Sequence, residues 1–135
     1  MHRLDFTQVH SYANDDHGVA VPVLLRAGAN NVRLVASVDT GASCCLFAGE
    51  LAEKLGLDLT SGERKRFRTA NSSLETFGHE IEIGTMGVVT YSMVYFFADP
   101  SIIKNVLGRA GWLDRVRLAL IHHDNTIYLA PHDHE

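Results

Sequence analysis

The stretch VDTGASCCLF, Val38 to Phe47, follows directly on an apolar run and decides how the sequence is interpreted. Within that run, apolar residues recur at every second position: Val32, Leu34, Ala36 and Val38. Because this period is typical of a β-strand with one buried face, Asp39 is expected where the strand ends and a turn begins. Gly41 and Ala42 are small, so another segment can approach their backbone closely. The pattern predicts a carboxylate on the floor of a cleft; the alternative is an ordinary turn, since Asp, Thr and Gly are all common turn residues.

The composition indicates one folded domain over residues 1–135, with a core over about 19–130 and a polar tail over 131–135. Hydrophobic residues make up 46% of the chain and charged residues 21%, close to the values of globular proteins. The formal net charge of -4 is the wrong sign for neutralising phosphates, so nucleic acid is not an expected partner. No apolar stretch approaches the roughly 18 residues of a membrane span, and the first residues lack the apolar core of a signal peptide. We therefore expect no membrane partner and a cytoplasmic location.

Turn signals recur about every ten residues, with alternating or apolar runs between them, and this spacing predicts a mainly β sandwich or barrel. Strands are expected over residues 4–10, 19–25, 32–38, 64–70, 74–83, 88–98, 117–121 and 126–129. One short helix is expected over 48–55, with Gly56 as its C-cap. A second is expected to start at Asp99 and Pro100 and to stop at Gly108.

The order of an apolar strand, DTGAS and apolar CCLF resembles the active-site segment of the retroviral-type (retropepsin-like) aspartic proteases. Farther along, the segment from Ile102 to Leu120 resembles the second signature of that family. In that signature two apolar residues are followed by Gly, then by Arg or a similar residue, and then by an apolar strand. Between them, Arg66 to Gly84 stands where such proteins carry the flap, the hairpin that folds over the substrate. The likeness covers about residues 19–129 and is strongest at Asp39 to Ala42 and at Val106 to Arg109. It implies the closed, barrel-like retropepsin (acid protease) fold, with one or two short helices and a flap hairpin.

The resemblance also implies a catalytic role for Asp39. Aspartic protease chemistry needs two carboxylates that share one proton: one activates a water molecule as general base, and the other polarises the scissile carbonyl. Because the DTG motif occurs once, the enzyme is expected to be a twofold homodimer in which the two Asp39 side chains meet on the axis. Thr40 is then expected to hydrogen-bond across the axis, and Gly41 to bring backbone groups to the peptide or protein substrate.

The remaining site residues follow from the same resemblance. Substrate-binding residues are expected beside the acid and at the flap tip: Ala42, Ser43, Asn71, Ser72 and Ser73. Structural support is expected from the second signature, at Leu107, Gly108 and Arg109. Ser43 stands where retroviral members often carry an acid that pairs with the Arg of the second signature, so Arg109 is expected to lack that partner. The expected tip contains no Gly, which predicts a broader or stiffer turn.

Adjacent cysteines and clustered histidines raise two further possibilities. Cys44 and Cys45 are neighbours, so a disulfide between them cannot link distant segments. They are expected to be small buried apolar residues; the alternative is a redox switch. Four histidines near the C-terminus invite a metal hypothesis: His122, His123, His132 and His134. Two lie in an expected hairpin turn and two in the polar tail, which is poor geometry for a four-ligand zinc site, so no metal or other cofactor is expected.

The run RKRFR, Arg64 to Arg68, is a local basic cluster. It is expected to be a strand with a solvated face, in preference to a nucleic-acid site. Beside a flap, it would also favour acidic residues in the substrate.

Together these features predict an aspartic-type endopeptidase, a hydrolase whose extended substrate lies under the flap and is selected by apolar pockets for large hydrophobic residues. An alternative is a catalytically inactive retropepsin-like module that binds peptides or dimerises, because fold does not fix activity. A third possibility is a half-enzyme that needs a different partner chain. Whether two Asp39 side chains face each other in a symmetric assembly distinguishes these interpretations.

Overall fold

The computed structural model describes residues 1–15 and 18–135 and shows a mainly β protein, as predicted. Ten strands are present in the described residues: β1 (Gln8–Ser11), β2 (Ala20–Ala27), β3 (Asn30–Val38), β4 (Leu46–Phe47), β5 (Glu63–Arg68), β6 (Ser73–Thr85), β7 (Val88–Phe97), β8 (Val106–Leu107), β9 (Val116–Ile121) and β10 (Thr126–Pro131). The helical elements are short: α1 (Gly49–Lys54) and the 3-10 helices η1 (Leu59–Ser61), η2 (Leu113–Arg115) and η3 (His122–Asp124). In this part of the chain, no helix has the length and hydropathy of a membrane span.

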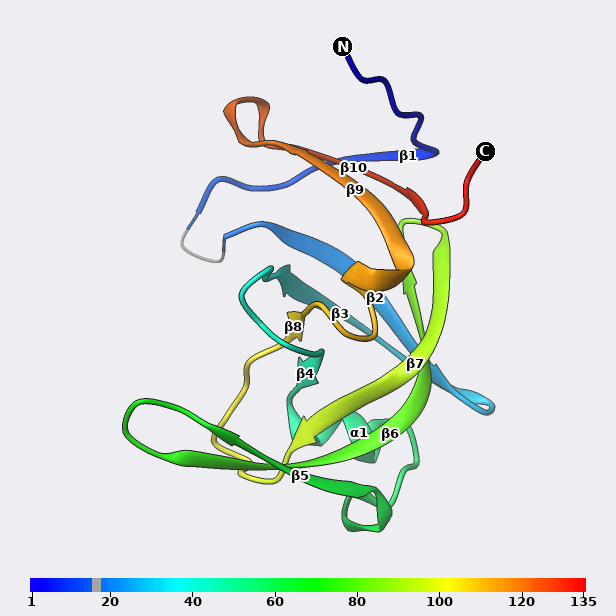
Figure 1. Ribbon diagram of the computed structural model, residues 1–135. Coiled ribbons are helices and arrows are strands. Elements are labelled where there is room, and N and C mark those ends of the chain that lie inside the picture. Colours follow the sequence, from blue (N-terminus) through cyan, green and yellow to red (C-terminus); the bar gives the residue numbers. More distant parts are fainter. Residues whose placement is uncertain (16–17) are drawn as a thin grey trace.

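Two sheets make up the fold (Figure 1). The larger has seven strands in the order β2-β3-β8-β4-β7-β6-β5, and β2 also pairs with β6, so the sheet closes into a ring from which β5 extends. The smaller sheet, in the order β1-β10-β9, pairs strands from the two ends of the chain. In Figure 1 this smaller sheet lies at the top, above the ring.

The strand β8 fixes the end of β3 from a distant part of the sequence. It lies between β3 and β4 in the large sheet, parallel to β3 and antiparallel to β4. Ser37 pairs with Val106, and Val38 pairs with Leu107. The residue directly before Asp39 is therefore held by the predicted second signature, and not only by its hairpin neighbour β2.

A continuous apolar core explains why the alternating strands take these positions. The strands β7 and β6 pair along ten residues, and β7 alternates between buried and more exposed positions along most of its length. The largest fully buried side chains include Trp112, Phe47, Phe96, Leu25, Ile81 and Leu107. Burial of apolar surface contributes about 25 cal/mol per Å² and is the main favourable term in folding. The ring of strands therefore gives the site a rigid support.

The predicted first helix is confirmed, and its end has the expected cause. α1 buries Leu51 and Ala52, and the chain leaves it through Gly56, whose φ is 73°. The N–H of Gly56 donates to the carbonyl of Glu53 at 2.9 Å, and the N–H of Leu57 donates to that of Ala52 at 3.0 Å. These are the two bonds of a Schellman motif, in which glycine takes the left-handed position without steric cost.

The predicted second helix, from Asp99 to Leu107, is wrong. Asp99 and Pro100 open a turn instead: the carboxylate of Asp99 accepts hydrogen bonds from the N–H of Ser101 at 2.9 Å and from its hydroxyl at 2.7 Å. These bonds lower the pKa of Asp99. The capping contact therefore forms, but no helix follows, because Val106 and Leu107 are taken up as the strand β8.

Several strand boundaries also differ from the predicted ones; β5, for example, ends at Arg68 and not at residue 70. The first strand covers Gln8–Ser11 and not residues 4–10, because its pairing with β10 sets its position. Ser73, expected at the tip of the flap hairpin, is the first residue of β6 and pairs with Arg68. The turn of that hairpin therefore lies one residue earlier than its sequence suggests.

Candidate active site

Asp39 is exposed at the start of a tight turn that follows β3. Its backbone N–H donates to the carbonyl of Leu107 at 3.0 Å, and its carbonyl accepts from the N–H of Ala42 at 3.2 Å. The N–H of Gly41 donates to Oδ1 of Asp39 at 2.8 Å. A methyl group at Gly41 would lie 3.1 Å from that oxygen and would crowd the bond. The turn thus presents an oriented carboxylate to solvent, with Thr40 exposed beside it.

The predicted second signature runs directly alongside this turn. The N–H of Arg109 donates to the carbonyl of Ala42 at 2.9 Å, and the N–H of Ala110 donates to that of Ser43 at 2.9 Å. Ala42 is half-buried, whereas the side chains of Ser43 and Arg109 are exposed. The structure therefore brings these two segments together mainly through their backbones.

Glycine is required at position 108 because of how closely the two segments approach. Gly108 is buried, and a methyl group there would overlap the carbonyl group of Cys44 and would lie 2.9 Å from the carbonyl oxygen of Ala42. Leu107, its neighbour, is fully buried in the core. The loop that carries Asp39 can rest on the second signature only while position 108 has no side chain.

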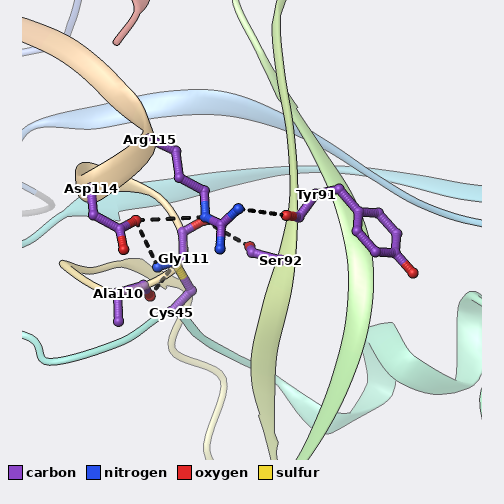
Figure 2. A network of polar contacts seen from close by, with 7 residues as sticks. All are labelled: Cys45, Tyr91, Ser92, Ala110, Gly111, Asp114 and Arg115. Carbon is purple, nitrogen blue, oxygen red and sulfur yellow. Dashed lines mark hydrogen bonds and ion pairs between the residues drawn. The ribbon is translucent and has the colours of Figure 1, made fainter. Parts of the chain in front are cut away.

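A network of polar contacts ties the end of the second signature to β7 (Figure 2). The buried hydroxyl of Ser92 donates to the carbonyl of Gly111 at 2.7 Å, and the N–H of Gly111 donates to Oδ1 of Asp114 at 3.0 Å. Nη1 of Arg115 donates to the carbonyl of Tyr91 at 3.0 Å. The sequence analysis missed this network. Its one signal was Ser92, a hydroxyl at an inward position of an alternating apolar strand.

The two cysteines behind the turn are free thiols and are both buried. Sγ of Cys45 donates to the carbonyl of Ala110 at 3.9 Å (Figure 2). Burial raises the pKa of Cys45 to about 12, and burial also raises the pKa of Cys44. Because the thiolate is the reactive form, this burial disfavours reaction of either thiol at neutral pH. This geometry agrees with small apolar residues and argues against the redox switch.

The hairpin of β5 and β6 closes through a pair of hydroxyl side chains. The N–H of Thr69 donates to the carbonyl of Ser72 at 2.8 Å, and the N–H of Ser72 donates to Oγ1 of Thr69 at 3.1 Å. Asn71 and Ser72 are exposed at the tip. In Figure 1 the tip extends to the left, the side on which the turn after β3 also lies. The turn is therefore stabilised by local hydrogen bonds and needs no glycine.

One face of this hairpin carries a cluster of a lysine and two aromatic rings. Nζ of Lys65 lies 5.0 Å from the ring centroid of Phe67 and 4.9 Å from that of Tyr95. The two rings meet edge to face, with centroids 5.7 Å apart. Each cation–π contact of this kind is worth about 0.5–1 kcal/mol at an exposed site. The N–H of Tyr95 donates to the carbonyl of Cys45 at 3.0 Å, so the cluster adjoins the end of the Asp39 loop.

The histidines considered as metal ligands take part in other contacts or lie near the end of the chain. Nδ1 of His122 lies 2.6 Å from the hydroxyl of Tyr12, and the two rings stack. Nδ1 of His123 lies 2.9 Å from Oδ1 of Asp124. Over residues 1–15 and 18–135, no group of three or more His, Cys, Asp and Glu side chains is arranged to hold a metal ion.

A separate cavity of about 370 Å³ lies between α1, η1 and the segment after β7. Apolar and acidic side chains both line it, among them Phe97, Ile102, Glu50 and Asp58. No residue of the Asp39 turn contributes to it. The oriented carboxylate therefore faces open surface in the single chain, away from this cavity.

Comparison with known proteins points to one family. The aspartyl protease family model matches residues 23–110, and comparison with curated protein sequences gives no match. The chain is similar to the crystal structure of a retropepsin-like aspartic protease from Rickettsia conorii, with 23% sequence identity and a TM-score of 0.65 over 91% of this chain and 97% of that chain. It is also similar to the EIAV protease complexed with the inhibitor HBY-793, with 20% identity and a TM-score of 0.55 over 76% of this chain and 92% of that chain.

These comparisons agree with the geometry. The matched range includes both the turn of Asp39 and the segment through Ala110 that holds it. The two solved structures share the fold of this chain. In this chain the fold consists of a ring of strands that includes the parallel pair of β3 and β8. The chain therefore belongs to the aspartyl protease family, as a retropepsin-like member.

Proposed function

We propose that the protein is an aspartic endopeptidase that is active as a twofold homodimer. The observation that carries this proposal is the exposed carboxylate of Asp39, oriented by the N–H of Gly41 on a turn whose backbone is fixed from both sides. Membership of the aspartyl protease family supports a protease-like function. One chain supplies one DTG motif and the chemistry needs two carboxylates, so a second copy completes the site.

In this mechanism the two Asp39 carboxylates share one proton, because like charges a few Å apart cannot both be ionised. A water molecule between them attacks the carbonyl carbon of the scissile peptide bond. The ionised carboxylate accepts a proton from that water, while the protonated carboxyl donates to the carbonyl oxygen. When the C–N bond breaks, the carboxyl that took the proton from water gives it to the leaving nitrogen, and the other carboxylate takes a proton back from a hydroxyl of the tetrahedral intermediate, so the pair again holds one proton. The enzyme forms no covalent bond to its substrate and requires no cofactor.

The neighbouring residues take roles that follow from their positions. Thr40, exposed next to Asp39, would hydrogen-bond across the axis and hold the two turns together, while Gly41 would offer its backbone to the substrate. The β5–β6 hairpin would act as the flap, with Asn71 and Ser72 at its tip. Ala42 and Ser43 would line the floor. An extended peptide between floor and flap would be bound through its backbone and selected by apolar side-chain pockets, with a preference for large hydrophobic residues.

We also place the enzyme in the cytoplasm, without nucleic-acid or membrane partners. The two cysteines are free thiols, which suits a reducing compartment. The net charge of -4 disfavours extended contact with phosphates.

The test is cleavage of casein and of a peptide library at pH ~4 to 7, a range that brackets a shared-proton dyad. The wild-type protein should cleave peptides, and Asp39→Asn should remove that activity without loss of fold. Asp58→Asn serves as the matched control, because Asp58 is an exposed carboxylate that lies outside the Asp39 turn. Activity per chain should rise with protein concentration, in step with the dimer fraction seen by analytical ultracentrifugation.

The possible outcomes separate the alternatives. Equal cleavage by the wild type and Asp39→Asn would identify a contaminant and overturn the proposal. A protein that binds peptides but never cleaves them would be an inactive binding module. Activity that appears only on addition of a different chain would identify a half-enzyme.

A further inference from the structure

The strand β5 concentrates positive charge in a chain that is acidic overall. Its sequence ERKRFR holds one carboxylate and four cations, while the whole chain has a formal net charge of -4. Side chains alternate along a strand, so Lys65 and Phe67 lie on one face, and Arg64, Arg66 and Arg68 lie on the other. Lys65 is therefore the one cation of this strand that shares the face of the aromatic residues.

That face continues toward the turn of Asp39. Tyr95 and Leu46 are opposite each other in the parallel pair of β7 and β4, so their side chains point to the same side of the sheet. The N–H of Tyr95 donates to the carbonyl of Cys45 at 3.0 Å. Burial raises the pKa of Cys44, while a hydrogen bond with Ser43 and the positive charge of Lys65 lower it. Lys65 thus faces the end of the loop that carries the acid.

The ammonium of Lys65 is fixed in position but has no carboxylate partner. The Phe67 and Tyr95 rings hold it at 5.0 Å and 4.9 Å from their centroids. Among the described residues no ion pair involves Lys65, whereas Arg64 of the same strand pairs with Glu75. Glu63 lies on the same face, two positions back along β5, and is likewise in no ion pair in the described part of the chain. A charge that is oriented by two rings and is not held in a salt bridge can attract an incoming carboxylate.

We propose that Lys65 is a specificity-determining residue, which selects peptides that carry a Glu or Asp side chain next to the large hydrophobic residues at the cleavage site. The inference rests on the proposed function, since it assumes that substrate lies between the β5–β6 hairpin and the Asp39 turn. An extended peptide there directs every second side chain toward the face of Lys65. The rings of Phe67 and Tyr95 offer apolar surface around the ammonium, and Leu46 pairs with Tyr95. One substrate carboxylate would therefore contact the charge while neighbouring side chains on that face contact the rings.

The experiment compares the cleavage specificity of four full-length proteins on one random peptide library. These are the wild type, Lys65→Met, Lys65→Glu and Arg66→Met. Methionine keeps a long flexible stem for the two rings and removes only the charge. Arg66→Met is the matched control, because it removes a neighbouring exposed cation from the opposite face of the same strand. A parallel arm uses Asp39→Asn protein, alone and combined with each substitution, immobilised to capture intact peptides from the same library for sequencing by mass spectrometry.

We expect the wild type to enrich Glu or Asp at a position near the cleaved bond, by about fivefold for one partly covered charge pair. Lys65→Met should lose this enrichment, Lys65→Glu should favour Lys or Arg at the same position, and Arg66→Met should behave as the wild type. Cleavage without acidic enrichment, or enrichment that survives Lys65→Met, overturns the inference and leaves the protease function standing. If none of the proteins cleaves peptides, the capture experiment decides. Capture of acidic peptides that depends on Lys65 would support the inference and contradict the proposed catalysis. Capture that does not depend on Lys65 would overturn the inference.

Discussion

The turn of Asp39 and the tip of the β5–β6 hairpin are stabilised by different kinds of contact. The turn is held by backbone hydrogen bonds to a segment far along the chain, with buried thiols behind it and Gly108 beneath it. The tip is exposed, and the hydrogen bonds that close it join Thr69 to Ser72. Backbone contacts in a packed core open only at high free-energy cost, whereas local contacts at the surface open easily. The contrast separates a turn that is held by contacts with the core from a hairpin tip that is held by local contacts.

This division suits the proposed chemistry. A carboxylate that shares a proton with its twin must be placed within a few tenths of an Å, so the rigid element carries the acid. A hairpin that admits and releases a peptide must move, so it carries few buried contacts at its end. Each of the following changes acts on one side of this comparison.

The largest effect is expected from Gly108→Ala. The added methyl group would overlap the carbonyl of Cys44, so either the Asp39 turn or β8 must shift. We expect a loss of about 3 kcal/mol in the free energy of unfolding, measured by urea denaturation. Gly84→Ala is the control, because a methyl group there would lie 3.6 Å from its nearest neighbour, an ordinary contact. Equal stability of the two variants would show that the Asp39 turn and β8 can shift to accommodate the methyl group at little cost.

A second effect should appear at alkaline pH. Burial raises the pKa of Cys45 to about 12 in the folded chain, against an ordinary value of 9.0. The folded state therefore retains a proton that the unfolded state loses, and stability must fall as the pH rises from 9 toward 12. The slope is at most about 1.4 kcal/mol per pH unit for one such group. Urea denaturation at pH 8 and pH 10 should show a smaller fall for Cys45→Ala than for the wild type, and identical falls would contradict the burial of this thiol.

A smaller and local effect is expected from Thr69→Val at the hairpin tip. The substitution keeps the side-chain shape and removes the hydroxyl that accepts from the N–H of Ser72. Amide exchange at the tip should accelerate by about fivefold, in line with one lost hydrogen bond of about 1 kcal/mol, while global stability stays within about 0.5 kcal/mol. Thr60→Val, at an exposed hydroxyl in η1, should leave exchange at the tip unchanged. A global loss above 1 kcal/mol would mean that the hairpin tip supports the core.

The smallest effect is expected from Arg109→Gln. The guanidinium of Arg109 is exposed, and its residue holds the Asp39 turn through the backbone N–H, which the substitution keeps. Stability should change by less than about 0.5 kcal/mol. Arg115→Gln should cost more, about 1 kcal/mol, because Arg115 donates to the carbonyl of Tyr91. A larger loss of stability for Arg109→Gln than for Arg115→Gln would show that the side chain of Arg109, and not its backbone, stabilises the Asp39 turn.

The parts of the fold that depend on local pattern could be read from the sequence. Period-two alternation through Val38 placed Asp39 at the end of a strand, and Gly56 ended the first helix as expected. The helix predicted after Asp99 did not form, although its capping contact did, because the strands β3 and β4 accept Val106 and Leu107 between them. A tertiary pairing thus overrode a local preference.

The candidate site was predictable to a similar degree. The family resemblance pointed to the second signature as structural support, but its contact with the DTG turn, backbone to backbone across Gly108, required the structure. The position of Lys65 over Phe67 and Tyr95 could not be predicted, because it depends on the registers of β5 with β6 and of β6 with β7. Cross-strand neighbours are fixed by register, and a slip of one residue would have turned Lys65 to the other face.

The parallel pairing of β3 with β8 has a consequence for the order in which the Asp39 turn is built during synthesis. The residues that shape the Asp39 turn, from Leu107 to Ala110, leave the ribosome well after Asp39 itself. Contacts between such distant parts of a chain form slowly during folding, because a long loop must first be closed. A nascent or shortened chain that ends before these residues has the acid but not the support that orients it. Synthesis itself therefore delays the orientation of this carboxylate until β8 and the residues after it have emerged.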